Sequence, residues 1–327
     1  MPDPVTILIT SAGATNAINV IDALRRTGLP LRLVCCDLDP LAAGLFMAER
    51  GYVLPRATDP GFIPRLLEIC SRERVDAVLP IYSAELPVFA RHKEEIEARG
   101  IRLSVPEEST LALCDDKLAV IQFFENIGVA CPKTWSYDEA IGGEFNYPVF
   151  LKRRTGSGSK DALRIDSRRD LDYHLKPDFV VQEFLDGEEF TVDVMSDLEG
   201  KMIAASPRVR NRIYGGLSIR GTTIQDQEII QTSKKIVEAL RLPGPSNLQC
   251  KRVTDGLKFF EINPRFASGG LPLAVAAGLN AAEILVRLLM GWELPEIKIR
   301  EGVVMNRYWS SQFLYQSEPG GKYEVRD

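Results

Sequence analysis

The stretch LKFFEINPRFASGG, residues 257–270, is the most informative part of this 327-residue chain. Residues two apart on a strand face the same way, so Glu261 and Asn263 should point together and offer two hard oxygen donors suited to Mg²⁺. Arg265 follows as a fixed cation, and this combination commonly holds a polyphosphate and its metal. Gln249, on the neighbouring strand-like run NLQCKRV, could add a ligand or orient one. A strand end capped by a surface ion pair is the alternative.

A second stretch, YPVFLKRRTGSGSKD at 147–161, predicts a strand that leads into a loop of small residues. Such a loop can turn its backbone amides toward an anion, and Lys152 lies on the strand that enters it. The spacing is not GxxxxGK followed by Ser or Thr, which disfavours a P-loop NTPase. A flexible hairpin with a solvated lysine is the alternative. The small loop residues are Gly156, Ser157, Gly158 and Ser159.

Two further segments carry regular patterns. Residues 114–135, CDDKLAVIQFFENIGVACPKTW, predict a helix that begins near the Asp-Asp pair and ends at Gly128. Lys117 is a cation in the first turn, where the helix dipole disfavours it, so we expect it to have another role. Residues 179–195, FVVQEFLDGEEFTVDVM, predict a strand, an Asp-Gly turn and a second strand with a two-residue period.

The first third of the chain alternates strand-like runs with helical patterns, which implies a parallel sheet with right-handed crossovers. The runs cover residues 5–10, 31–39, 75–81 and 101–105, with helices at about 61–73 and 84–98 among them. In such a sheet, ligands bind beyond the carboxyl ends of the strands.

Polar residues follow those strand ends. The first turn, SAGATNA, has one glycine where the dinucleotide fingerprint has three, so a nucleotide site there is disfavoured. We favour a small-molecule pocket lined by Ser11, Asn16, Tyr82 and Glu85. A tight strand-to-helix turn, with Glu85 solvated near a helix start, is the alternative.

Composition and charge narrow the classes of protein. Lys plus Arg number 40 and Asp plus Glu 45, a net charge of −5 that argues against a nucleic-acid binder working by phosphate neutralisation. No apolar run reaches the roughly 18 residues of a membrane span, so no membrane partner is expected. Six cysteines without a CxxC, and only two histidines, disfavour a zinc site or a disulfide framework. We therefore expect a reduced, cytoplasmic protein.

Taken in order, four motifs resemble those of the ATP-grasp superfamily and, within it, proteins similar to the carbamoyl phosphate synthase large subunit. They are DDK at 115–117, VFLKRRTGSGSKD at 149–161, VQEFLDGEEFTVDV at 181–194 and FFEINPRF at 259–266, in a resemblance that covers roughly 5–310. The resemblance implies an α/β domain, with a Rossmann-like parallel sheet, followed by a two-lobed α+β ATP-grasp domain. Their boundaries would be 1–110 and 111–310, with a mobile lid at about 128–188 and a flexible tail at 311–327. The family enzyme is several-fold longer and has two such modules, so this chain is not expected to be that enzyme in full.

The resemblance also implies an ATP site. Two lysines would contact the phosphates, a mobile loop would cover them, a linker would read adenine through its main chain, and a glutamate would hold the ribose hydroxyls. In that order, these are Lys117 and Lys152, Gly156 to Ser159, Glu183 to Leu185 with Phe184 between them, and Glu189. The loop ends Ser-Lys-Asp where the family commonly has Ser-Lys-Gly, and a carboxylate at Asp161 would disfavour loop closure unless it points away or pairs with Lys160.

Metal and substrate roles follow from the same resemblance. Glu261 and Asn263 resemble ligands of Mg²⁺, or of Mn²⁺ in its place, and Arg265 resembles the clamp on phosphate and intermediate. Arg208 and Arg212, just before a Gly-Gly pair, resemble arginines that help bind an acyl phosphate.

The activity that the resemblance implies is ATP-dependent ligation of a carboxylate to an amine through an acyl phosphate, with release of ADP and phosphate. Glu85 would suit an ammonium group and the arginines a carboxylate, which hints at an amino-acid-like substrate. A nucleotide-binding sensor or partner subunit without turnover is the alternative, and a nicotinamide-dependent oxidoreductase is a weaker one. A homodimer is expected only from family habit.

Overall fold

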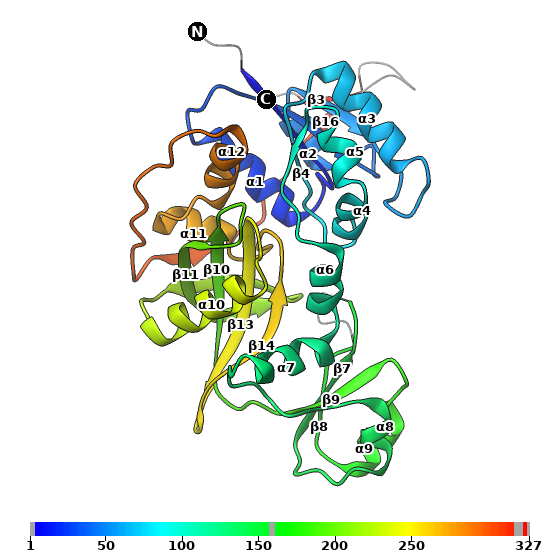
Figure 1. The fold of residues 1–327 in the computed structure, drawn as a ribbon, viewed down its shortest axis with the longest axis vertical. Coiled ribbons are helices and arrows are strands. Elements are labelled where there is room, and N and C mark those ends of the chain that lie inside the picture. The colour runs from blue at the N-terminus through cyan, green and yellow to red at the C-terminus, as the bar shows by residue number, and fades with distance from the viewer. Residues whose placement is uncertain (1–3, 157–160, 317–322, 326–327) are drawn as a thin grey trace.

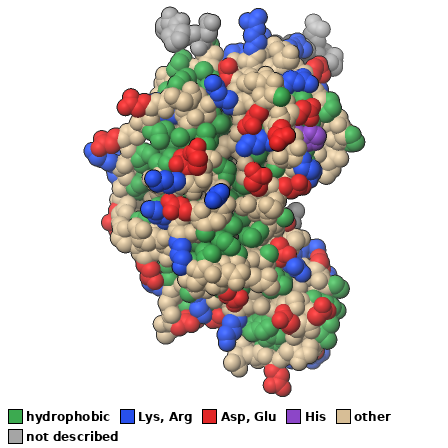
Figure 2. Space-filling model, in the orientation of Figure 1, with side chains coloured by type: hydrophobic (Ala, Val, Ile, Leu, Met, Phe, Trp, Pro, Cys, Tyr) green, Lys and Arg blue, Asp and Glu red, His purple; other side chains and the backbone are tan. Residues whose placement is uncertain are grey.

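The computed structural model describes residues 4–156, 161–316 and 323–325. Figure 1 shows the N-terminal third at the top, a large sheet with its helices in the middle, and a small lobe at the bottom. On the face shown in Figure 2, basic and acidic side chains are interspersed, and the surface is hollowed where the small lobe meets the rest of the molecule.

The N-terminal third forms the predicted parallel sheet. Its strand order is β3-β2-β1-β4-β5, and all neighbouring pairs are parallel. The strands are β1 (Val5–Ile9), β2 (Leu31–Asp37), β3 (Arg50–Val53), β4 (Ala77–Leu79) and β5 (Arg102–Leu103). The helices are α1 (Thr15–Arg25), α2 (Ala43–Met47), α3 (Phe62–Glu73), α4 (Leu86–Arg91) and α5 (Lys93–Glu97).

Two details differ from the sequence-based prediction. The helix expected at 84–98 is divided at His92, which lies outside helical geometry between α4 and α5. The short elements β3 and α2 were not predicted, because four and five residues give too little periodicity to recognise.

A six-stranded sheet forms the centre of the molecule, in the order β14-β13-β10-β11-β12-β15. Its strands are β10 (Glu188–Ser196), β11 (Met202–Tyr214), β12 (Leu217–Thr223), β13 (Pro245–Val253), β14 (Gly256–Asn263) and β15 (Val304–Asn306). The helices that accompany it are α6 (Glu108–Asp115), α7 (Lys117–Asn126), α10 (Gln227–Ala239), α11 (Leu271–Ala277) and α12 (Ala281–Met290).

The alternation along β10 gives this sheet one apolar and one polar face. Phe190, Val192 and Val194 are buried in a core that includes side chains of α7 and α10. The intervening positions carry Thr191 and Asp193, which are buried but polar. Because paired residues on neighbouring strands share a face, the polar side chains of β10, β11, β13 and β14 form one surface.

The small lobe is an antiparallel sheet in the order β6-β9-β7-β8. Its strands are β6 (Thr134–Trp135), β7 (Val149–Arg153), β8 (Leu163–Ile165) and β9 (Phe179–Glu183), with α8 (Tyr137–Gly142) and α9 (Arg168–His174). It falls within the predicted lid, although the mobility of that lid and the domain boundaries stay predictions. In the predicted tail, β16 (Leu314–Gln316) and β17 (Tyr323–Val325) pair antiparallel.

Among the described residues, no single helix is both long and apolar enough to cross a membrane. Only α11 and α12 taken together reach that length and composition, and they are bent by 80° relative to each other.

Candidate functional site

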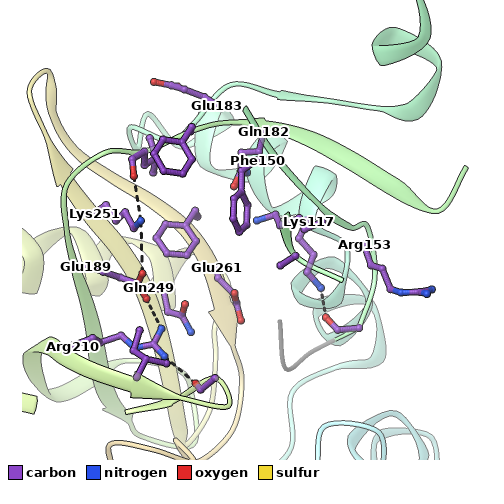
Figure 3. Close-up of a pocket in the computed structure, with 18 of the residues that line it drawn as sticks. Lys117, Phe150, Arg153, Gln182, Glu183, Glu189, Arg210, Gln249, Lys251 and Glu261 are labelled. Atoms are coloured by element: carbon purple, nitrogen blue, oxygen red, sulfur yellow. Dashed lines mark hydrogen bonds and ion pairs between the residues drawn. The ribbon is translucent and has the colours of Figure 1, made fainter. Parts of the chain in front are cut away.

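A cavity of about 470 Å³ lies between β7 and β9 of the small lobe and the polar face of the large sheet (Figure 3). Most of the predicted nucleotide-binding residues and two of the predicted metal ligands line it together, although they lie far apart in the sequence. These are Lys117, Lys152, Gly156, Glu183, Phe184, Leu185, Glu189, Gln249 and Glu261. Ser157, Gly158 and Ser159 were predicted to belong with them, but they lie outside the described residues.

Lys117 and Lys152 give one end of the cavity its positive charge. Asp116 caps α7, accepting hydrogen bonds from the amides of Leu118 at 2.9 Å and Ala119 at 3.2 Å, so the lysine that follows begins the helix at the cavity wall. Its ammonium donates to the carbonyl oxygen of Gly156. This contact explains a cation in the first turn of a helix: Lys117 ties α7 to the small-residue loop.

Lys152 projects from β7 with its ammonium 5.8 Å from the ring centre of Phe260. Burial lowers the pKa of Lys152 to about 8; the charge of Glu261 opposes this shift and that of Lys117 adds to it. An anion such as a phosphate would restore the charged form, so the site is electrostatically suited to one.

Asp161, the departure from the family loop, accepts a hydrogen bond from Arg153 Nε at 2.7 Å. Figure 3 shows the Arg153 side chain pointing outward from the cavity. The aspartate is thus paired with Arg153, whereas Lys160, the partner that the sequence analysis named, lies outside the described residues.

Glu189 lies at the other end of the cavity between two cations (Figure 3). It forms an ion pair with Arg210, and Lys251 Nζ is 3.8 Å from its Oε2. Arg210 also donates to the carbonyl of Gly216 at 2.9 Å, and Lys251 donates to that of Leu185 at 3.2 Å. The sequence analysis missed Arg210 and Lys251. The two-residue period of β11 could have identified Arg210, because it lies midway between the two arginines that were selected.

The linker after β9 is held by contacts with neighbouring segments. Glu183 accepts a hydrogen bond from Lys258 Nζ at 2.6 Å and another from the amide of Lys133 at 3.1 Å. The ring of Phe184 has Arg164 above it at 4.9 Å. The chain from Glu183 to Leu185 is therefore fixed at the cavity wall, where its main chain can meet a planar base.

The predicted metal ligands lie on the adjacent strands β13 and β14, and two of them, Gln249 and Glu261, line the cavity. Gln249 pairs with Glu261 across β13 and β14, and Asn263 Nδ2 donates to Glu261 Oε1 at 2.8 Å. Asn263 Oδ1 in turn accepts from Arg265 Nη2 at 3.1 Å. Asn263 and Arg265 are joined to the site through this chain but do not line the cavity.

One carboxylate and two amide oxygens fit Mg²⁺, which proteins usually hold through one or two carboxylates with water and substrate phosphate completing the shell. No group of three or more His, Cys, Asp or Glu side chains able to hold a metal occurs in the part of the chain that the structure describes. The set Gln249, Glu261 and Asn263 is thus suited to a metal that arrives with a polyphosphate rather than to a permanent ion.

The predicted acceptor pocket is arranged differently. Glu85 is buried and accepts hydrogen bonds from Thr10 Oγ1 at 2.6 Å and Ser11 Oγ at 2.8 Å. Burial raises the pKa of Glu85, and the two hydroxyls oppose that shift. Asn16 donates to the carbonyl of Ile81 at 3.0 Å, and Tyr82 is half exposed. None of the four predicted residues lines the cavity.

Arg265 connects this edge of the parallel sheet to β14. Its Nε donates to Ser83 Oγ at 3.0 Å, while its Nη2 reaches Asn263. Burial lowers the pKa of Arg265. The predicted clamp therefore sits where the two larger sheets meet.

The two remaining predicted arginines differ in environment. Arg208 is buried and pairs with Asp193 at 2.9 Å. Arg212 is exposed on β11 opposite Arg220. Neither lines the cavity.

Two parts of the chain match known family models. Residues 175–308 match the family model described as ATP-grasp in the biosynthetic pathway with Ter operon, and residues 7–104 match the PylC-like N-terminal domain. These matches confirm the predicted resemblance and fold class: along the chain, a PylC-like N-terminal domain is followed by an ATP-grasp domain.

Individual relatives are more distant. The carbamoyl phosphate synthase large chain of Thermotoga neapolitana is 24% identical over 290 residues, which cover 81% of this chain and 25% of the relative. The chain thus spans about a quarter of the length of such relatives.

Solved structures share the fold at low identity. The L-amino acid ligase from Bacillus licheniformis has a TM-score of 0.71 at 17% identity, covering 89% of this chain and 75% of its own. The biotin carboxylase domain dimer of Hydrogenobacter thermophilus 2-oxoglutarate carboxylase, in complex with MgADP, ADP and bicarbonate, has a TM-score of 0.72 at 15% identity, covering 97% and 82%.

Proposed function

We propose that this protein is an ATP-dependent carboxylate–amine ligase that forms an acyl phosphate, releases ADP and phosphate, and acts on an amino-acid-like substrate. The observation that carries the proposal is the cavity itself. It brings together two lysines, Gly156 at the start of the small-residue loop, the linker at 183–185, the glutamate proposed for ribose, and a carboxylate and an amide suited to Mg²⁺.

The proposed nucleotide pose follows the charges. Lys117 and Lys152 neutralise the phosphates at one end, and Glu189 accepts the ribose hydroxyls at the other. Between them, the main chain from Glu183 to Leu185 faces adenine. Glu261, Asn263 and Gln249 would hold Mg²⁺, or Mn²⁺, which neutralises charge between phosphate and carboxylate as they approach each other.

No side-chain nucleophile is needed for this chemistry. The task is to bring two anions together and to keep water from the acyl phosphate, and positive groups around the reacting atoms meet the first demand. We assign Arg265 to this role, because it reaches from the end of β14 to Ser83 Oγ. We assign exclusion of water to closure of the small lobe over the cavity.

We place the acceptor substrate on the N-terminal side of Arg265. Ser11, Asn16, Tyr82 and Glu85 lie at that edge of the parallel sheet, and Arg208 and Arg212 lie on β11. Small-molecule carboxylates and amines are the proposed partners. A homodimer and a cytoplasmic location belong to the same proposal.

Release of ADP from Mg-ATP in the presence of pooled amino acids tests the proposal. We expect release that depends on one pool and is lost in Lys152→Met. Lys176→Met, which removes an exposed lysine from the same lobe, is the matched control and should retain the activity.

Tight ATP binding with no ADP release from any pool, in the wild type, would instead support a nucleotide-binding sensor. Release that persists in Lys152→Met would contradict the assignment of the phosphate site.

A further inference from the structure

Two guanidinium groups flank the loop at residues 268–270, outside the cavity described above. Arg208 comes from β11 of the large sheet, and Arg307 follows β15. A Cβ added to Gly270 would lie about 2.1 Å from the Arg208 guanidinium, so that group packs directly on the glycine. Arg307 Nη2 donates to the carbonyl of Ser268 at 3.3 Å. The two cations therefore share one short loop.

Arg208 has more hydrogen-bond donors than partners. Its side chain is only 4% exposed, and its Nε donates to Asp193 Oδ2 at 2.9 Å. Its Nη1 is buried without a partner among the described residues, and so is Asp193 Oδ1. A closed, self-sufficient ion pair would satisfy these atoms, because buried polar groups are nearly always hydrogen-bonded. The pair of Arg208 and Asp193 leaves Arg208 Nη1 without an acceptor.

Arg307 has the same excess. Its Nη2 also reaches Asn19 Oδ1 of α1 at 3.3 Å, while its Nε is buried without a partner within the described chain. Burial lowers the pKa of Arg307, and the charge of Arg208 adds to that effect. Arg307 is only partly buried as a whole residue, which leaves a route from solvent.

The cluster is connected to the proposed ATP site through the register of the large sheet. Thr191 of β10 pairs with Arg208 on one side and with Gln249 on the other. Arg208, which carries one of the unpartnered donors, thus lies two strands away from a proposed metal ligand, on the same polar face. Asp193 is the carboxylate paired with Arg208, and among the described residues no ion pair joins Arg307 to a carboxylate, so positive charge is in excess.

We propose that Arg208 and Arg307, positioned by Asn19 and the 268–270 loop, form a subsite for the carboxylate of the small-molecule substrate. Planar guanidinium forks match a carboxylate, and two of them with spare donors at one loop provide the geometry for it. The inference deepens the proposed ligase function and rests on it: the group held here belongs to the molecule that reacts at the neighbouring phosphate.

The test uses sodium malonate as the probe and the thermal midpoint of the full chain as the readout, with ionic strength held constant by NaCl. We expect malonate to raise the midpoint of the wild type. In Arg307→Gln its apparent affinity should fall at least about tenfold, because a charge-assisted pair is lost. Arg300→Gln removes an exposed arginine of the same segment and should behave as the wild type. Arg208→Lys keeps a charge beside Asp193 but loses the fork, and should also weaken malonate.

An equal malonate response in the wild type and Arg307→Gln would overturn the subsite, as would no response at all; ordered water would then be the partner of the spare donors. A response to inorganic phosphate but not to malonate would overturn its assignment to a carboxylate. Mg-ATP is titrated in parallel, and Arg307→Gln should bind it as the wild type does. If the wild type did not bind Mg-ATP but did respond to malonate, the proposed function would be contradicted and the carboxylate subsite would stand.

Discussion

The cavity and the edge of the N-terminal sheet both gather polar side chains, but they use them differently. In the cavity, Lys152, Glu189 and Glu261 come from separate strands and face one open volume. At the sheet edge, Glu85 is buried and both of its oxygens accept hydrogen bonds from hydroxyls of the adjacent turn. Charges that converge on empty space are available to a ligand, whereas the oxygens of a buried carboxylate that already accept hydrogen bonds are less available to one. We therefore expect substitutions in the cavity to change turnover or ATP binding, and substitutions at the sheet edge to change the free energy of unfolding.

The largest expected effect is that of Glu261→Ala on ADP release. This substitution removes the single carboxylate of the proposed metal set and the acceptor for Asn263 Nδ2. We expect turnover to fall roughly a hundredfold or more, because charge at the reacting phosphate would no longer be organised. Steady-state ADP release at saturating Mg-ATP is the measurement.

The matched control is Glu199→Ala, which removes an exposed carboxylate from the turn between β10 and β11. It should turn over as the wild type does. Substantial turnover in Glu261→Ala would mean that the cavity is not organised around this carboxylate.

Lys152 offers a sharper test, through pH. Its pKa of about 8 means that the ammonium form is lost as pH rises through that value, so kcat/KM for ATP should decline above pH 8. Lys152→Arg places a group with a much higher pKa on the same strand. Its alkaline decline should move up by at least about one pH unit, whatever its absolute rate.

A pH–rate profile of both proteins between pH 6 and about 10 makes the measurement. If kcat/KM of Lys152→Arg declined at the same pH as that of the wild type, the decline would belong to another group. The electrostatic argument for Lys152 at the phosphates would then fail.

The sequence predicted the cavity residues better than it predicted the sheet edge, for a physical reason. The cavity residues belong to local motifs, such as FFEINPRF, in which strand alternation alone decides which side chains point together. The register between Gln249 and Glu261 then confirmed the predicted neighbouring strand. The parallel sheet was likewise predicted, because its strands are continuous apolar runs.

What could not be predicted depends on contacts between distant segments. Arg210 meets Glu189 only because β10 and β11 pair in one particular register, and Thr10 meets Glu85 across 75 residues. Composition and periodicity carry no information on such pairings. Glu85 was therefore assigned to ligand binding, whereas the structure shows its two oxygens engaged by hydroxyls; a substrate role for it stays a prediction.

Arg210→Ala should have a moderate effect on the cavity. Arg210 holds Glu189 and the carbonyl of Gly216 at once, and so joins the ribose end of the site to the turn between β11 and β12. Losing this tie should raise the Kd for ATP about three- to tenfold with little change in turnover at saturation, which is about 0.7–1.4 kcal/mol.

Isothermal titration calorimetry with ATP measures the Kd, and Arg220→Ala, on the neighbouring strand, is the control. Unchanged ATP affinity in Arg210→Ala would show that Glu189 needs only Lys251 beside it. Tighter binding would show that the ion pair competes with the ribose.

Glu85→Gln should leave ATP binding within about twofold of wild type and act on stability instead. It keeps the shape of the side chain but changes one acceptor into a donor facing Thr10 and Ser11, at a cost of about 1 kcal/mol in the free energy of unfolding.

The pKa of Glu85 is raised in the folded state, so at pH values above the ordinary glutamate pKa the folded protein binds more protons than the unfolded chain. The free energy of unfolding of the wild type therefore decreases as pH rises through that interval, and Glu85→Gln should lose this dependence. Urea unfolding at several pH values measures both effects, with the exposed Glu97→Gln as control. A loss of substrate-dependent turnover at unchanged stability would reverse the comparison: Glu85 would then face a ligand, as the charges of the cavity do.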